Sequence, residues 1–165
     1  MTSAQRTAKI ESYGRAPEEL AVALKELPRD MWKYKPAPDR WSIHEIIIHL
    51  ADSEANSFIR GRAFLTEPGK TIMAYDQDKW ARELNYHAQD TELALELFRC
   101  LRKSTYNLLR TAPVSVWDRT IVHPEAGLMT MDRWLEIYEH HTHGHISQMR
   151  KNFEAWEKRK SPVTA

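Results

Sequence analysis

Histidines are concentrated near the end of the chain, where four of its eight histidines fall within the segment His140–His145. The surrounding pattern is helical, and residues three or four apart share one face of a helix. His141 and His145 therefore lie on one aromatic stripe, whereas His140 and His143 point elsewhere. Two imidazoles at i and i+4 can bind one metal ion. The pair alone is equally consistent with two histidines that bind no metal and form hydrogen bonds to a neighbouring helix.

A third ligand is needed for a metal site, and His49 is the candidate, far earlier in the chain. It lies in a helical pattern that begins at Ser42, where Glu45 three residues later completes a capping box. Three neutral imidazoles that leave one position of a divalent ion open are typical of catalytic sites. Such an ion lowers the pKa of a water molecule or thiol that it binds. Spacing alone leaves open whether the two helices are neighbours.

Four long helices are expected to carry these residues, at about 17–27, 43–65, 90–110 and 130–158. Residues 1–15 are polar and are expected to be loosely held, so that 16–160 form one domain. In the third helix we expect an inward stripe with Cys100 as a small core residue. The stripe consists of Leu93, Leu97, Cys100 or Leu101, Ser104 and Leu108. Strand signals are limited to weak alternation over 119–123.

This pattern predicts an all-α fold, a four-helix bundle. The two long segments without a clear period, 69–85 and 117–130, allow crossover connections in place of simple up-and-down wiring.

Composition limits the possible partners and location. The 165 residues include 24 basic and 23 acidic side chains, for a formal net charge of +1. This balance gives no electrostatic reason to expect binding to nucleic acid or to an anionic membrane surface. The single cysteine cannot form an intramolecular disulfide, and neither a signal peptide nor a membrane span is evident. We therefore expect a soluble cytoplasmic protein.

A resemblance to a known family strengthens the metal hypothesis. The run Trp41–Glu54 (Trp-Ser-Ile-His-Glu-Ile-Ile-Ile-His-Leu-Ala-Asp-Ser-Glu), together with the late segment His141–Ile146, resembles the DinB/YfiT-like superfamily. The resemblance covers nearly the whole chain, from about Pro17 to Lys151. It implies a four-helix bundle of unusual connectivity that is often a homodimer. It also implies a three-histidine site for a divalent metal ion such as zinc or nickel.

By this resemblance the family's ligands fall on His49, His141 and His145, the last two of which the helical period selects independently. The sequence departs from the family at one point, because members often have a histidine pair followed by two residues before the final ligand. Here His143 is interposed, so the preference for His141 over His140 depends on its i, i+4 spacing from His145. The roles of His140 and His143 stay open.

Further candidates could support or surround such a site. Glu45 and Asp52 lie one turn from His49, and they are either acceptors that orient its ring or ordinary solvated carboxylates. The long segment 69–87 is aromatic and aperiodic, so we expect it to form part of a substrate pocket. Its candidate pocket residues are Tyr75, Gln77, Trp80 and Tyr86. The sequence assigns no catalytic acid or base.

Two functions from different classes remain. The first is an enzyme whose three-histidine metal site activates a nucleophile that attacks a small-molecule substrate. The resemblance includes both S-transferases that use a low-molecular-weight thiol and proteins labelled as metal-dependent hydrolases, and three ligands cannot separate the two. The second is a non-catalytic, stress-associated binding or dimerisation module with a structural metal. A fourth protein ligand would favour the structural role.

Overall fold

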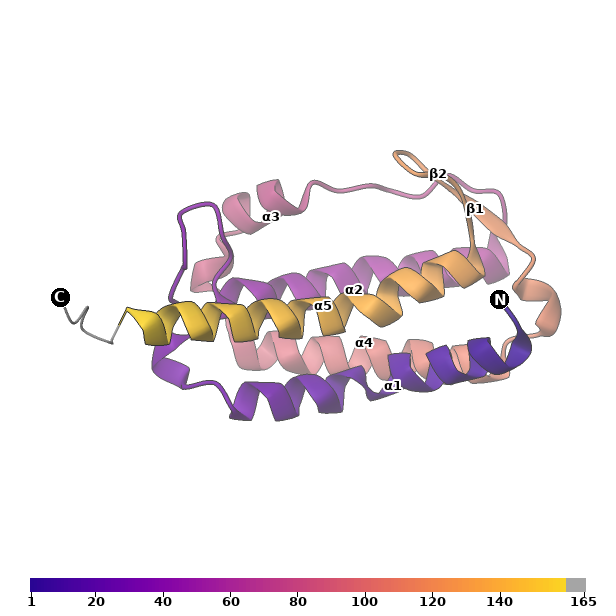
Figure 1. Ribbon diagram of the computed structural model, residues 1–165. Helices are drawn as coiled ribbons and strands as arrows, with labels where there is room; N and C mark the ends of the chain where they lie inside the picture. Colours follow the sequence, from indigo (N-terminus) through magenta and orange to yellow (C-terminus); the bar gives the residue numbers. More distant parts are fainter. Residues whose placement is uncertain (160–165) are drawn as a thin grey trace.

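The structure is a computed structural model that describes residues 1–159, and it consists mainly of helices (Figure 1). The helices and strands, in chain order, are α1 (Ser3–Lys25), α2 (Ile43–Thr66), α3 (Gln77–Glu83), α4 (Thr91–Thr111), β1 (Thr120–His123), β2 (Gly127–Thr130) and α5 (Met131–Lys158). Short 3₁₀ turns precede α2, α4 and β1. The long helices confirm the expected four-helix bundle, to which an antiparallel hairpin of β1 and β2 is added.

The bundle has a crossover topology. Helices α4 and α5 each pack against both α1 and α2, so that α1 and α2 lie diagonally opposite each other. In Figure 1, the neighbours α2 and α4 run in the same direction, as do α1 and α5, whereas α2 and α5 run in opposite directions. Parallel neighbours require a connection that returns along the bundle. The segment between α2 and α4, which includes α3, provides that return.

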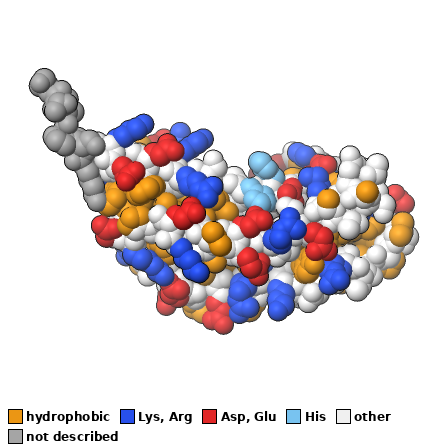
Figure 2. Space-filling model, turned by 60° about the horizontal axis from the view of Figure 1, so that its bottom comes forward, with side chains coloured by type: hydrophobic (Ala, Val, Ile, Leu, Met, Phe, Trp, Pro, Cys, Tyr) orange, Lys and Arg blue, Asp and Glu red, His pale blue; other side chains and the backbone are white. Residues whose placement is uncertain are grey.

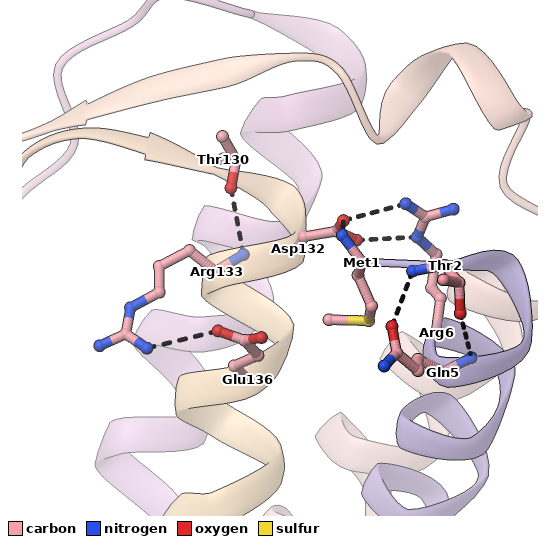
Figure 3. A network of polar contacts seen from close by, with 8 residues as sticks. All are labelled: Met1, Thr2, Gln5, Arg6, Thr130, Asp132, Arg133 and Glu136. Atoms are coloured by element: carbon pink, nitrogen blue, oxygen red, sulfur yellow. Dashed lines mark hydrogen bonds and ion pairs between the residues drawn. The ribbon is translucent and has the colours of Figure 1, made fainter.

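The first helix begins much earlier than expected. Thr2 and Gln5 form a capping box, and α1 continues from Ser3 through Pro17 to Lys25. Near this start, Asp132 in the first turn of α5 accepts hydrogen bonds from Arg6 at 2.7 and 2.9 Å, and the amino group of Met1 lies 3.3 Å from the same carboxylate (Figure 3). The expectation that residues 1–15 are loosely held is therefore wrong, because polar contacts to α5 and the burial of Ile10 and Tyr13 in the core hold this segment.

Helix α4 turns a different face inward from the one expected. Most of the predicted stripe is exposed, namely Leu93, Leu97, Cys100 and Ser104, and Leu93 retains 65% of its surface. Leu101 and Leu108 are half-buried. The buried face instead carries Ala94, Phe98, Arg102, Thr105 and Leu109. The prediction from hydrophobic periodicity failed because the buried face contains Arg102 and Thr105. Such a prediction places arginine and threonine on the solvent-exposed face.

The site is located on the two helices that the caps define best. Helix α2 begins at the capping box of Ser42 and Glu45, and α5 begins at Thr130, whose hydroxyl accepts a hydrogen bond from the backbone N–H of Arg133 (Figure 3). Within residues 1–159, every helix is too short or too polar to span a lipid bilayer.

Candidate metal centre

The structure brings the three predicted histidines together at the α2–α5 interface. The Nε2 atom of His141 lies 3.2 Å from Nε2 of His49 and 3.1 Å from Nε2 of His145. Two nitrogens that share a tetrahedral zinc at about 2.0–2.1 Å are roughly 3.3 Å apart, so this spacing suits a common ion. His49 is buried, while His141 and His145 are half-buried.

The protonation of the three rings also fits a metal ion. Burial lowers the pKa of His49 to about 3, with a further contribution from His145. Burial also lowers the pKa of His141 and of His145, so all three rings are neutral near pH 7. A hydrogen on Nε2 of His141 can be donated to only one of its two neighbours, which leaves lone pairs facing each other. A divalent cation would satisfy all three nitrogens, and the residues present therefore fit such an ion.

Aromatic and amide side chains hold the rings in place. The ring of Trp41 lies 4.6 Å from that of His49 and stacks on His145 at 6.4 Å. Asn152 of α5 donates a hydrogen bond to the backbone carbonyl of Trp41 at 2.9 Å, which fixes this residue against the site. Gln148 Oε1 lies 3.0 Å from Nδ1 of His145, an acceptor position that leaves Nε2 of that ring free to bind a metal.

A buried ion pair reaches the residue next to His141, and no sequence pattern indicated it. Arg102 of α4 is fully buried and lies 2.7 Å from the carboxylate of Glu54 on α2. It also donates hydrogen bonds to the carbonyl of Tyr138 at 3.1 Å and to the hydroxyl of Thr142 at 3.2 Å. Tyr13 of α1 donates a hydrogen bond to Glu54. This network joins all four long helices one residue beyond His141.

The two carboxylates predicted to lie next to His49 have other partners. Glu45 caps α2 through Ser42 and pairs with Lys35 at 3.0 Å. Asp52 accepts a hydrogen bond from the Tyr86 hydroxyl at 2.5 Å. The Nδ1 atom of His49 is buried, and no residue in the described range forms a hydrogen bond with it. Neither carboxylate orients His49, and packing against Trp41 fixes the ring instead.

The pocket candidates of the 69–87 segment differ in how deeply they are buried. Tyr86 is fully buried, and its bond to Asp52 ties the segment to α2. Tyr75 is half-buried against Trp80, with ring centroids 4.5 Å apart. Gln77 is exposed at the start of α3. Burial raises the pKa of Asp52, although the bond from Tyr86 acts in the opposite direction. Whether these residues contact a substrate stays a prediction.

The two neighbouring histidines of α5 are outside the cluster. His140 is exposed, whereas His143 lies between α1 and α5, 3.3 Å from Glu19 and 3.8 Å from Glu139. Among the histidine, cysteine and acidic side chains of residues 1–159, only His49, His141 and His145 group in a way that could hold a metal ion. Of the two alternatives, the geometry selects His141 over His140.

The fold and the cluster define a four-helix bundle with a candidate three-histidine metal centre between two antiparallel helices. The chain belongs to the DinB superfamily, which matches residues 12–149.

Similar proteins carry names that refer to a metal. A protein of Bacillus cereus (strain 03BB102) named "putative metal-dependent hydrolase" is 32% identical over 139 residues, which cover 82% of this chain and 79% of the relative. A protein of Oceanobacillus iheyensis with the same description is 33% identical over 109 residues, 66% of this chain and 63% of the relative. Among solved structures, YfiT from Bacillus subtilis, described as a probable metal-dependent hydrolase with an unusual four-helix bundle topology, matches with a TM-score of 0.85. It is 26% identical, and the match covers 92% of this chain and 87% of that one.

Proposed function

We propose that the protein is a metal-dependent enzyme of the hydrolase type, in which His49, His141 and His145 hold one divalent ion. The observation that carries this proposal is the convergence of three neutral imidazole nitrogens, two of the contacts being 3.2 and 3.1 Å. The names of the relatives support the same class. When bound, such an ion supplies the Lewis acidity that turns a water molecule or a thiol into a nucleophile near neutral pH.

The residues of the chain divide the remaining work. Trp41 and Gln148 fix the direction of the imidazoles, and the neutral state of the rings keeps their nitrogens available for the ion. His141 and His145 are half-buried, and a substrate would approach the cluster from their side. A structural metal would instead be enclosed by a fourth protein ligand, and the described acidic, histidine and cysteine side chains supply three. This favours an enzyme over a non-catalytic module.

The first test is the metal content of the purified, untagged protein, measured by elemental analysis beside the variants His49→Ala and His141→Ala. About one divalent ion per chain in the wild type is expected, with loss from both variants, because two imidazoles hold a metal far less tightly than three. The matched control is His143→Ala, which removes a histidine from the same helix but outside the cluster and should keep the ion. Retention of full metal by both cluster variants would refute the site.

The second test separates the two nucleophiles. Metal-loaded protein is assayed on a panel of esters and amides, and on electrophiles offered together with low-molecular-weight thiols. Hydrolysis without added thiol that is lost in His141→Ala would support a water nucleophile. Turnover that requires a thiol would support the transferase alternative.

A further inference from the structure

A cationic side chain lies along the same helix interface as the histidines. Arg60 follows His49 by eleven positions on α2, so at about 100° per residue the two residues point only about 20° apart around the helix. Its Nη1 atom donates a hydrogen bond to the Tyr138 hydroxyl at 2.8 Å. Tyr138 in turn lies one turn before His141 on α5, with ring centroids 6.2 Å apart. Because α2 and α5 are antiparallel, both residues lie on the same side of the cluster (Figure 1).

The partners of Arg60 leave its charge uncompensated. Its second bond, from Nη2, goes to the backbone carbonyl of Met73 at 2.6 Å. Both acceptors are neutral, and no carboxylate within residues 1–159 lies close enough to Arg60 to form an ion pair. The side chain is half-buried. A guanidinium has five N–H donors in a planar fork that matches a carboxylate, so donors remain for a ligand.

A second hydroxyl lies within the electrostatic field of the same cation. Burial raises the pKa of Tyr75 and of Tyr138, and in both cases the charge of Arg60 acts in the opposite direction. Arg60 therefore contacts one phenolic hydroxyl, that of Tyr138, and its charge also acts on Tyr75. On the face drawn in Figure 2, acidic and basic side chains are interspersed. Arg62 and Arg119 are also half-buried arginines with neutral partners, and Arg60 differs from them in its bond to Tyr138, the neighbour of His141.

We infer that Arg60, together with the Tyr138 hydroxyl, binds a carboxylate group of the substrate while the reactive end of that substrate lies at the histidine cluster. This inference rests on the proposed function and specifies its substrate class as an organic acid. The alternative role for Arg60 is a tether that holds the connection at Met73 on α2. The two roles differ in what they predict for neutral ligands: a tether affects acids and neutral ligands alike, whereas an anion site affects acids alone.

The experiment uses cobalt(II)-loaded protein, whose visible absorption changes when a thiolate binds the metal. The probes are ω-mercaptocarboxylates of three to eight carbons, each paired with the ω-mercaptoalcohol of equal length, and both are titrated into the wild type and Arg60→Met. In the wild type, one chain length should favour the acid over the alcohol by roughly tenfold, as expected for a charge-assisted bond. In Arg60→Met, the acid should fall to the affinity of the alcohol, while the alcohol stays unchanged. Arg82→Met, which removes an exposed arginine paired with Glu83 on α3, is the matched control.

Other outcomes would overturn the inference. Equal affinities for acid and alcohol at every length in the wild type would exclude an anion site, as would an acid preference that survives in Arg60→Met. Parallel losses of acid and alcohol would assign Arg60 to the tether. Absence of any thiol binding to cobalt-loaded protein would also refute the inference but leave the metal site intact. A protein that takes up no cobalt would instead refute the proposed function, and metal analysis shows this before any thiol is added.

Discussion

Replacing Arg102 by methionine removes the cation from the centre of the bundle but keeps a side chain of similar length. The change leaves Glu54, which is 1% exposed, without a cation in the interior. It also removes the hydrogen bonds that the guanidinium donates to Tyr138 and Thr142. Removal of one partner from a buried ion pair costs about 3–5 kcal/mol, because the remaining charge cannot be solvated. For a chain of this length, such a loss lowers Tm by on the order of 10 °C.

The double variant Arg102→Met/Glu54→Met separates the stranded charge from the loss of packing. Replacement of both partners of a buried pair by apolar side chains is often neutral or stabilising, so the double variant should recover most of the stability lost in Arg102→Met. Urea unfolding, monitored by circular dichroism on metal-free protein, completes the double-mutant cycle. The expected coupling is about 2 kcal/mol or more between the two sites.

The pH dependence provides an independent check. Burial raises the pKa of Glu54, and Arg102 and Tyr13 oppose that effect. Without Arg102, the pKa of Glu54 in the folded variant is higher than in the wild type, so the folded variant keeps the Glu54 proton at a pH where the unfolded chain releases it. The variant therefore gains stability relative to the wild type as the pH falls. The stability difference should therefore be smaller at pH 5 than at pH 7. A loss below about 1 kcal/mol in Arg102→Met, or a difference that does not change with pH, would show that Glu54 is not stranded and would refute the reasoning.

Two further predictions concern the helices and the histidines. In Gly61→Ala, the new Cβ would lie 3.0 Å from the ring of the fully buried Trp134, so we expect a loss of about 1–3 kcal/mol in urea unfolding; Gly144→Ala meets no atom within 4 Å and should gain about 0.5–1 kcal/mol. Burial lowers the pKa of His49 to about 3, so the unfolded chain takes up a proton below pH 6.5 that the folded chain refuses. Metal-free protein should then lose up to about 1.4 kcal/mol per pH unit from this residue between pH 6.5 and 4, and a shallower slope is expected for His49→Ala. Equal slopes for the two proteins would contradict the buried, neutral state of the ring.

Local signals predicted the helices that carry the site. The capping box at Ser42 placed the start of α2, Thr130 placed the start of α5, and both helices begin where these signals indicate. The i, i+4 period placed His141 and His145 on one face, and the structure confirms that His49 joins them. Spacing could not pair α2 with α5, since helix adjacency depends on the packing of the whole bundle. The family resemblance supplied that information.

Buried polar residues account for the wrong inward face that was predicted for α4. The hydrophobic period of α4 predicted that Leu93 faces inward. The inward face was missed because it includes the polar residues Arg102 and Thr105. Arg102 is tolerated there only because Glu54 comes from another helix, and no local pattern can show such a pairing. Arg60 could have been found, since an offset of eleven residues from His49 returns to nearly the same face.

The buried ion pair and the candidate metal centre have complementary roles in one interface. The ligand atoms of His49, His141 and His145 lie within 4.8 Å of one another, and without a cation the rings cannot all be satisfied by hydrogen bonds to each other. Hydrophobic packing alone would let the helices shift to separate them. Arg102 resists that shift, because its bonds to Thr142 and Glu54 fix the register of α5 against α2 at the residue next to His141. The network thus preorganises the two helices, so metal binding requires less additional ordering. On this view, Arg102→Met should weaken metal affinity even where the protein stays folded, and metal titration at low temperature would detect the loss.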